Sequence, residues 1–78
     1  MGEERIISLF RKVVEGDETA FRVFFETYSR RLFHLAYYYL NSRELAEEAV
    51  LDVFTVVWQK RETLAHVKEP GHYLYVAV

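Results

Sequence analysis

The stretch RELAEEAVLDVFTVVWQKR, residues 43–61, carries the clearest periodic pattern of the chain. Its apolar residues recur at intervals of three or four, a spacing that places side chains on one face of a helix. This stripe consists of Ala46, Ala49, Val50, Val53, Phe54 and Val57, with Trp58 on its flank. Because Val and Phe are only moderate helix formers, the helix is predicted from periodicity more than from intrinsic propensity.

A longer helix is predicted over residues 18–40. One face of it holds Phe21, Phe24, Phe25, Tyr28, Leu32, Leu35, Ala36 and Tyr39. Phe33 and Tyr37 lie on the opposite side, so we expect this helix to be central and to pack against neighbours on two sides. Asp17 and Ser42 are the residue types that cap helix N-termini, here for residues 18–40 and 43–61.

Two further helices flank this pair. Residues 3–15 carry a stripe of Ile6, Leu9, Phe10 and Val13, widened by Ile7 and Val14. Gly16 follows as a left-handed C-cap. Residues 62–69 show no helical period and are predicted to be a loop, after which Pro70 opens a last helix that contains Tyr73, Leu74 and Ala77. We expect this last helix to be cut short at Val78.

The composition agrees with this helical pattern. The chain has 78 residues, of which 51% are hydrophobic and 17% aromatic, but only three are Gly and one is Pro. So few turn-forming residues exclude a β-sandwich or barrel with many short strands. We therefore expect an all-α fold: one domain over residues 1–78, built as a compact bundle of about four helices.

Several classes of function are disfavoured by the residue inventory. There is no Cys, which excludes a disulfide framework, a thiolate zinc site and a cysteine nucleophile, and fits a reducing cytoplasm. The three His residues have no zinc-protease spacing, and no Gly-rich phosphate loop is present. No apolar stretch approaches the about 18 residues of a membrane span. We expect neither an enzyme nor a metal, a cofactor or a membrane partner.

Opposite the apolar stripe of residues 43–61 lies a mixed face. It contains Glu48, Asp52, Thr55 and Gln59, with Leu51 beside them and Leu45 and Val56 on the other shoulder. Acidic groups around a small apolar patch suit a partner helix rich in Arg and Leu. The alternative is an ordinary solvated face, since scattered exposed apolar residues are normal.

Cationic and aromatic residues alternate near the C-terminus. They are Lys60, Arg61, His66, Lys68 and His72, interleaved with Tyr73 and Tyr75. Such a mixture suits single-stranded nucleic acid, because bases stack on rings while cations hold phosphates. The net charge of −2 gives no basic footprint in support. In the alternative interpretation, Tyr73 and Leu74 only cover the core.

Three stretches in this order carry a family resemblance: VVEGDETAFRVFFETY (13–28), LNSRELAEEAVLDVFTVVWQKRETL (40–64) and PGHYLYVAV (70–78). Together they resemble region 2 of bacterial RNA polymerase sigma factors of the extracytoplasmic-function group. The resemblance implies an all-helical, cytoplasmic domain. It would bind the clamp helices of the polymerase's largest subunit and open the promoter −10 element.

The resemblance also assigns residues to polymerase binding. The family has an acidic residue, a Gln, a second acidic residue, a Phe and a Trp at fixed spacing, which correspond here to Glu48, Leu51, Asp52, Phe54 and Trp58. Leu51 departs from the usual Gln, which removes an amide hydrogen bond. With Thr55 on the same outward face, the expected polymerase-binding set is Glu48, Leu51, Asp52 and Thr55. In this family an anti-sigma protein often covers that face.

For DNA, the family uses the loop before the last helix and the exposed side of that helix. By position this implicates Lys60, Arg61, Lys68, His72, Tyr73 and Tyr75 in holding the non-template strand of the −10 element with a base flipped out. Family members continue the last helix further and carry a second, helix-turn-helix domain for the −35 element. We therefore expect the chain to be a fragment of a longer sigma factor.

A different class of function remains open on the residues alone. The chain could be a helical interaction or oligomerisation module without a DNA role. Its seam would then consist of Phe33, Tyr37, Leu45, Leu51 and Val56.

Overall fold

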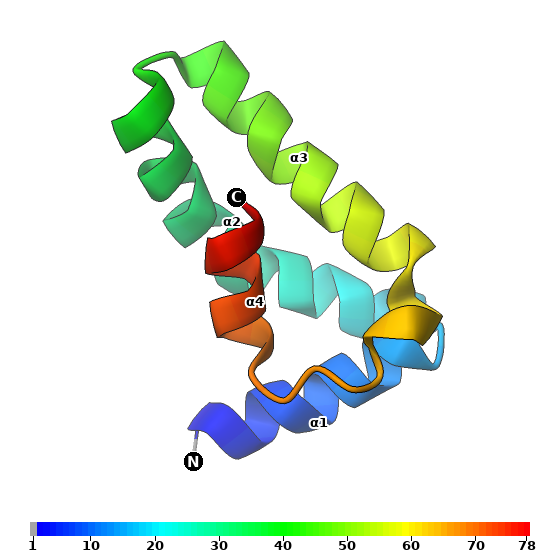
Figure 1. The fold of residues 1–78 in the computed structure, drawn as a ribbon. Coiled ribbons are helices and arrows are strands. Elements are labelled where there is room, and N and C mark those ends of the chain that lie inside the picture. Colours follow the sequence, from blue (N-terminus) through cyan, green and yellow to red (C-terminus); the bar gives the residue numbers. More distant parts are fainter. Residues whose placement is uncertain (1) are drawn as a thin grey trace.

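In the computed structural model, which describes residues 2–78, the chain folds into four α-helices and one short 3-10 helix (Figure 1). They are α1 (Gly2–Val14), α2 (Glu18–Leu40), α3 (Arg43–Gln59), η1 (Arg61–Leu64) and α4 (Pro70–Ala77). The side chains are described from residue 4 onward. No strand occurs in residues 2–78, so the expectation of an all-α fold is confirmed.

The predicted helix ends agree with the cap geometry. Gly16 adopts a φ of 95°, which only glycine reaches without strain, and turns the chain after α1. Asp17 Oδ1 accepts a hydrogen bond from Ala20 N at 3.0 Å and begins α2. Ser42 Oγ accepts one from Leu45 N at 3.3 Å and begins α3. These side-chain oxygens satisfy amides that have no partner within the helix.

α2 is the central element. It contacts α1, α3 and α4, as its two apolar sides predicted. Figure 1 shows α3 returning from the far end of α2, while α1 crosses the opposite end and α4 lies against α1 and α2. α2 has the length of a membrane span, but no helix in residues 2–78 is both long and apolar enough to cross a bilayer.

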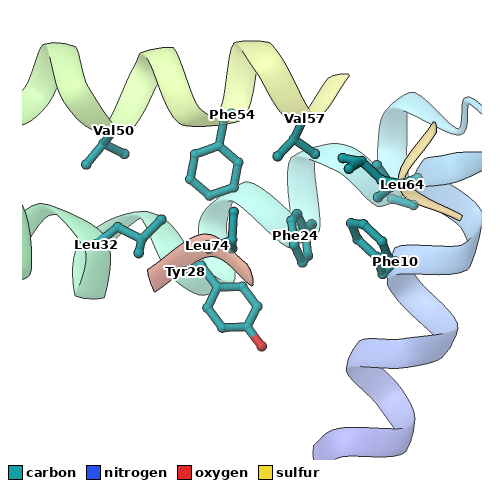
Figure 2. Packing of buried hydrophobic residues seen from close by; sticks show 11 residues of the cluster. Phe10, Phe24, Tyr28, Leu32, Val50, Phe54, Val57, Leu64 and Leu74 are labelled. Atoms are coloured by element: carbon teal, nitrogen blue, oxygen red, sulfur yellow. The ribbon is translucent and has the colours of Figure 1, made fainter. Parts of the chain in front are cut away.

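One hydrophobic cluster joins all five elements (Figure 2). Its fully buried side chains are those of Val13, Phe24, Leu32, Val57 and Leu74. The ring centre of Phe24 lies 5.4 Å from that of Phe10 and 5.9 Å from that of Phe54, which ties α2 to both α1 and α3. Such tilted and edge-on aromatic pairs contribute about 0.5–1.5 kcal/mol each beyond the burial of their area.

Two expectations were wrong: the burial of one side chain and the position at which one helix ends. Tyr39 was expected on the inward face, but 74% of its surface is exposed, because the last turn of α2 reaches past the elements that cover the rest of the helix. The α-helix expected to run to Arg61 ends at Gln59. Arg61 instead begins η1, which continues to Leu64 and so includes the first three residues of the segment expected to be a loop. Burial of Leu64 in the core holds this 3-10 turn against the bundle.

Candidate functional site

The outer side of α3 presents the residues assigned to partner binding. Glu48, Leu51, Asp52 and Thr55, which we call the α3 face, are all exposed, and Leu51 keeps 56% of its surface accessible. Their orientation follows from the opposite side of the helix, where Ala46, Val50, Phe54 and Val57 are buried against the core. The Ser42 cap determines where α3 begins.

The carboxylates of the α3 face have no cationic partner. Among residues 4–78 the one ion pair joins Arg43 Nε to Glu47 Oε1 at 3.2 Å, and it includes neither Glu48 nor Asp52. Glu48 and Asp52 are one helical turn apart, and like charges at this spacing destabilise a helix by about 0.2–0.5 kcal/mol. A cation supplied by a partner would relieve this repulsion as well as form new ion pairs.

Thr55 offers a partner fewer free hydrogen-bonding positions than the carboxylates do. Its Oγ1 donates a hydrogen bond to the Leu51 carbonyl oxygen at 2.8 Å, so its proton is used within α3. The lone pairs of Thr55 Oγ1 and the Thr55 methyl group remain available to a partner. Thr55 therefore offers an acceptor and a small apolar surface beside Leu51.

A groove between α2 and α3 adjoins the α3 face and was not predicted from the sequence. Its volume is about 360 Å³, and it is lined by Phe25, Ser29, Arg30, Phe33, Arg43, Glu47, Val50 and Leu51. The only sequence signal was Phe33 on the second side of α2. Its ring stacks parallel to that of Tyr37, with centres 5.9 Å apart and planes at 7°. Leu51 thus stands beside an apolar hollow rather than on a flat surface.

The six residues assigned to DNA separate into two groups. Arg61 lies next to the C-terminal end of α1, since its Nε is 3.6 Å from the position of a Cβ on Gly16, and Lys60 precedes it in the chain. Lys68 and His72 instead line a cleft together with Arg5, near the start of α1. Arg5 and Gly16 are eleven residues apart, which corresponds to a distance of about 16 Å along a helix axis. The cationic groups therefore face two ends of the molecule.

The two tyrosines of α4 differ in accessibility. Tyr73 is half-buried and packs against the core cluster, whereas Tyr75 keeps 40% of its surface exposed. His72 precedes Tyr75 by three residues and so shares its side of the helix. Of the two rings, Tyr75 is the one free to stack on a ligand.

The five apolar residues of the alternative seam do not lie on one strip. Leu51 lies beside Phe33 at the groove between α2 and α3. Leu45 and Val56 are exposed on the other shoulder of α3, more than 100° around the helix axis at about 100° per residue. Any self-association through the groove would therefore leave Leu45 and Val56 uncovered.

Comparison with known proteins gives one match. A family model described as sigma-70 region 2 matches residues 24–78, which include most of α2 and all of α3 and α4. Neither the curated proteins nor the solved structures gave a match. The matched region contains the whole α3 face and all six residues assigned to DNA.

Proposed function

The chain belongs to the sigma-70 region 2 family, whose members are non-enzymatic domains of transcription initiation factors, and on that premise we propose that its α3 face docks on the clamp helices of RNA polymerase. The observation that carries the proposal is the pair of carboxylates Glu48 and Asp52, which form no ion pair within residues 4–78, beside the exposed Leu51. Arginines of the partner would bind the two carboxylates, and an apolar side chain would cover Leu51.

The energies of these contacts depend on how much water the interface excludes. Hydrogen bonds to charged groups contribute about 1.5–3 kcal/mol each when they are desolvated. At a wet rim the same ion pairs contribute about 0–1 kcal/mol. The two carboxylates and Leu51 would therefore contribute most to binding if the partner fills the groove beside Leu51 and excludes water.

Leu51 changes the chemistry expected at the centre of this anchor. The residue usual for the group is Gln, which would donate and accept hydrogen bonds through its amide. Leu51 offers apolar area instead, next to the groove lined by Phe25 and Phe33. We propose that burial of Leu51 against a partner side chain in this groove replaces the lost hydrogen bonds. Such burial contributes about 25 cal/mol per Å² of apolar surface removed from water.

For the promoter, we propose that the C-terminal part holds the non-template strand of the −10 element. Tyr75 would stack on an unpaired base, and Lys68 and His72 would contact phosphates near it, with Lys60 and Arg61 contacting the strand at a second position. Stacking on an aromatic ring contributes about 1–3 kcal/mol per base. This offsets the few kcal/mol that unstacking a base costs, so melting needs no bond chemistry.

We also propose that the chain is of the extracytoplasmic-function group and acts in the bacterial cytoplasm with the polymerase. The order of the three quoted stretches supports this assignment. An anti-sigma protein that covers the α3 face would then compete with polymerase for Glu48 and Asp52. The α3 face would then both bind polymerase and be the surface through which that binding is inhibited.

The first experiment is a pull-down of bacterial core polymerase, and of its isolated clamp helices, with the native chain and with Asp52→Arg. The native chain should bind and Asp52→Arg should not, because the new cation would face the partner's arginines. Glu15→Arg changes the net charge equally at an exposed residue after α1 and should bind as the native chain does. Equal retention of all three proteins would exclude the α3 face as the anchor.

The oligomerisation module remains a second candidate because the groove between α2 and α3 is open. Sedimentation of the native chain over a range of concentrations tests it directly. A dimer that Phe33→Ala dissociates, together with absence of polymerase binding, would favour self-association over the anchor.

A further inference from the structure

A cleft with a volume of about 940 Å³ lies between the start of α1, the middle of α2 and the start of α4, and we call it the basic cleft. Aliphatic side chains line part of it, among them Ile6 and Ile7 of α1 and Val23 of α2. Ile7 and Val23 keep 41% and 44% of their surface exposed, so the chain itself does not cover this apolar wall. Sites that hold a whole small ligand measure roughly 300–1,000 Å³, so several side chains of a partner helix fit into a cleft of this size.

The charged side chains of the basic cleft are mostly cationic. Arg5, Arg31 and Lys68 line it against a single carboxylate, that of Glu69, and all three cations are exposed. None of the three makes an ion pair within residues 4–78. Arg5 and Arg31 also have no part in the function proposed above. Positive charge beside apolar surface favours a partner that is both acidic and apolar.

The α3 face has this complementary character. The carboxylates of Glu48 and Asp52 form no ion pair within residues 4–78, and Leu51 beside them keeps 56% of its surface exposed. Over its whole length α3 holds four acidic residues and one basic residue. Together with Thr55, the face follows the i, i+3, i+4, i+7 spacing by which an amphipathic helix lies in a groove. The chain therefore presents both an acidic helix face and a basic, partly apolar cleft.

The two surfaces cannot meet within one molecule. No residue of α3 lines the basic cleft. Figure 1 shows the start of α1 and the start of α4 near one end of the molecule, whereas α3 begins near the other end. The α3 face also points outward, away from the side of α3 that is buried in the core. A contact between the face and the cleft therefore joins two copies of the chain.

We propose that the basic cleft of one chain binds the α3 face of a second copy. Arg5 and Arg31 form ion pairs with the two carboxylates of the face. Leu51 packs against the apolar wall that contains Ile7 and Val23. One helix face and one cleft bury less than the about 1,200 Å² of a stable complex, so we expect a dissociation constant on the order of 0.1 mM.

Self-association of this kind would regulate the α3 face. A copy whose face lies in the cleft of another copy could not use the same face for docking on polymerase. This consequence rests on the proposed function, whereas the self-association itself does not. At high local concentration, other copies of the chain would compete with polymerase for Glu48 and Asp52.

Sedimentation equilibrium of the native chain at concentrations up to about 1 mM tests the association. At about 0.1 M salt, where the Debye length is about 10 Å, the mean mass should rise with concentration. At about 1 M salt, where the Debye length is about 3 Å, it should fall toward the mass of the monomer, because exposed ion pairs are screened. Association that salt does not weaken would overturn the proposal.

Two charge reversals locate the contact. Arg31→Glu alters the cleft and Asp52→Arg alters the face, so each protein alone should associate at least about tenfold more weakly than the native chain. An equimolar mixture of the two should regain association, because the former keeps its α3 face and the latter keeps its cleft. Regained association also shows that both variants are folded.

The matched controls are Arg22→Glu and Glu15→Arg, which make the same charge changes at exposed residues outside both surfaces. Both should associate as the native chain does. A native chain that stays monomeric up to about 1 mM, a mixture that associates no better than its two components, or an equal loss in the controls would overturn the proposal. Because no polymerase is present, such a result would leave the proposed docking of the α3 face unaffected.

Discussion

The guanidinium carbon of Arg61 lies 4.2 Å from the centre of the Trp58 ring, and Arg61 Nη1 donates a hydrogen bond to the Trp58 carbonyl oxygen. One side chain thus stacks on the last turn of α3 and also donates to a carbonyl oxygen there, which the backbone N–H of Lys60 contacts as well. Trp58 in turn lies 4.9 Å from Phe21, centre to centre, which connects this end of α3 to α2. Arg61 therefore has a structural role besides the proposed contact with DNA.

Arg61→Ala should lower the free energy of unfolding by about 1–2 kcal/mol. The estimate combines a partly exposed cation–π contact with one charged hydrogen bond. Urea denaturation monitored by Trp58 fluorescence measures it. Lys60→Ala is the matched control, because Lys60 is exposed and its side chain makes no hydrogen bond or ion pair within residues 4–78. Equal effects of the two substitutions would contradict the role of the stacked pair.

Leu51→Ala should weaken polymerase binding by about tenfold while leaving the free energy of unfolding within about 0.5 kcal/mol of the native value. The reason is that Leu51 is exposed in the free chain and would become buried only in the complex. Leu45→Ala removes the same group from a residue of similar exposure on the other shoulder of α3 and should have no effect on binding. Surface plasmon resonance on immobilised clamp helices compares the three proteins. A greater loss for Leu45→Ala would move the docking surface to that shoulder.

Gly71→Ala should destabilise the fold by about 1–3 kcal/mol, as overpacked sites do. The added Cβ would approach Tyr28 Oη at 2.9 Å and Cε1 at 3.2 Å, so the ring or the start of α4 must shift. In a Tyr28→Phe background the closest of these contacts is gone, and the same substitution should cost less. A double-mutant cycle from thermal or urea unfolding measures the coupling between the two positions. A coupling of zero would show that the Tyr28 hydroxyl does not limit the space at Gly71.

Stability should also fall at high pH through Tyr28. Its pKa is raised from the ordinary value of 10.0, chiefly by burial, whereas Arg31 lowers it and Tyr75 raises it. The folded state therefore holds this proton more tightly than the unfolded state does. The contribution is complete below pH 10 and is lost as the pH rises through the folded-state pKa. Urea unfolding of the native chain and of Tyr28→Phe across this range should show a steeper decline for the native chain, and parallel declines would refute the assignment.

Much of the fold depends on features that act within a few residues, and these were predictable from the sequence. Asp17 and Ser42 bond to amides three residues ahead, so their role as caps follows from local spacing. The same holds for the buried stripe of α3, because helical periodicity alone brings Val50, Phe54 and Val57 to one side. The exposure of the α3 face follows from that stripe, since the remaining positions must point outward.

The exposure of residues at helix ends and the clefts between helices were decided by the tertiary structure. Periodicity put Tyr39 on the inward side of α2, yet only the position of the other helices shows that the last turn has nothing to cover it. The joining of Arg5, Tyr28 and Lys68 in one cleft, like the separation of Lys60 from Lys68, results from how the helices cross and pack. Caps and stripes are determined by the sequence itself because they act over one or two turns. Clefts and grooves are decided only by tertiary packing, because crossing angles depend on how all the buried side chains fill the core together.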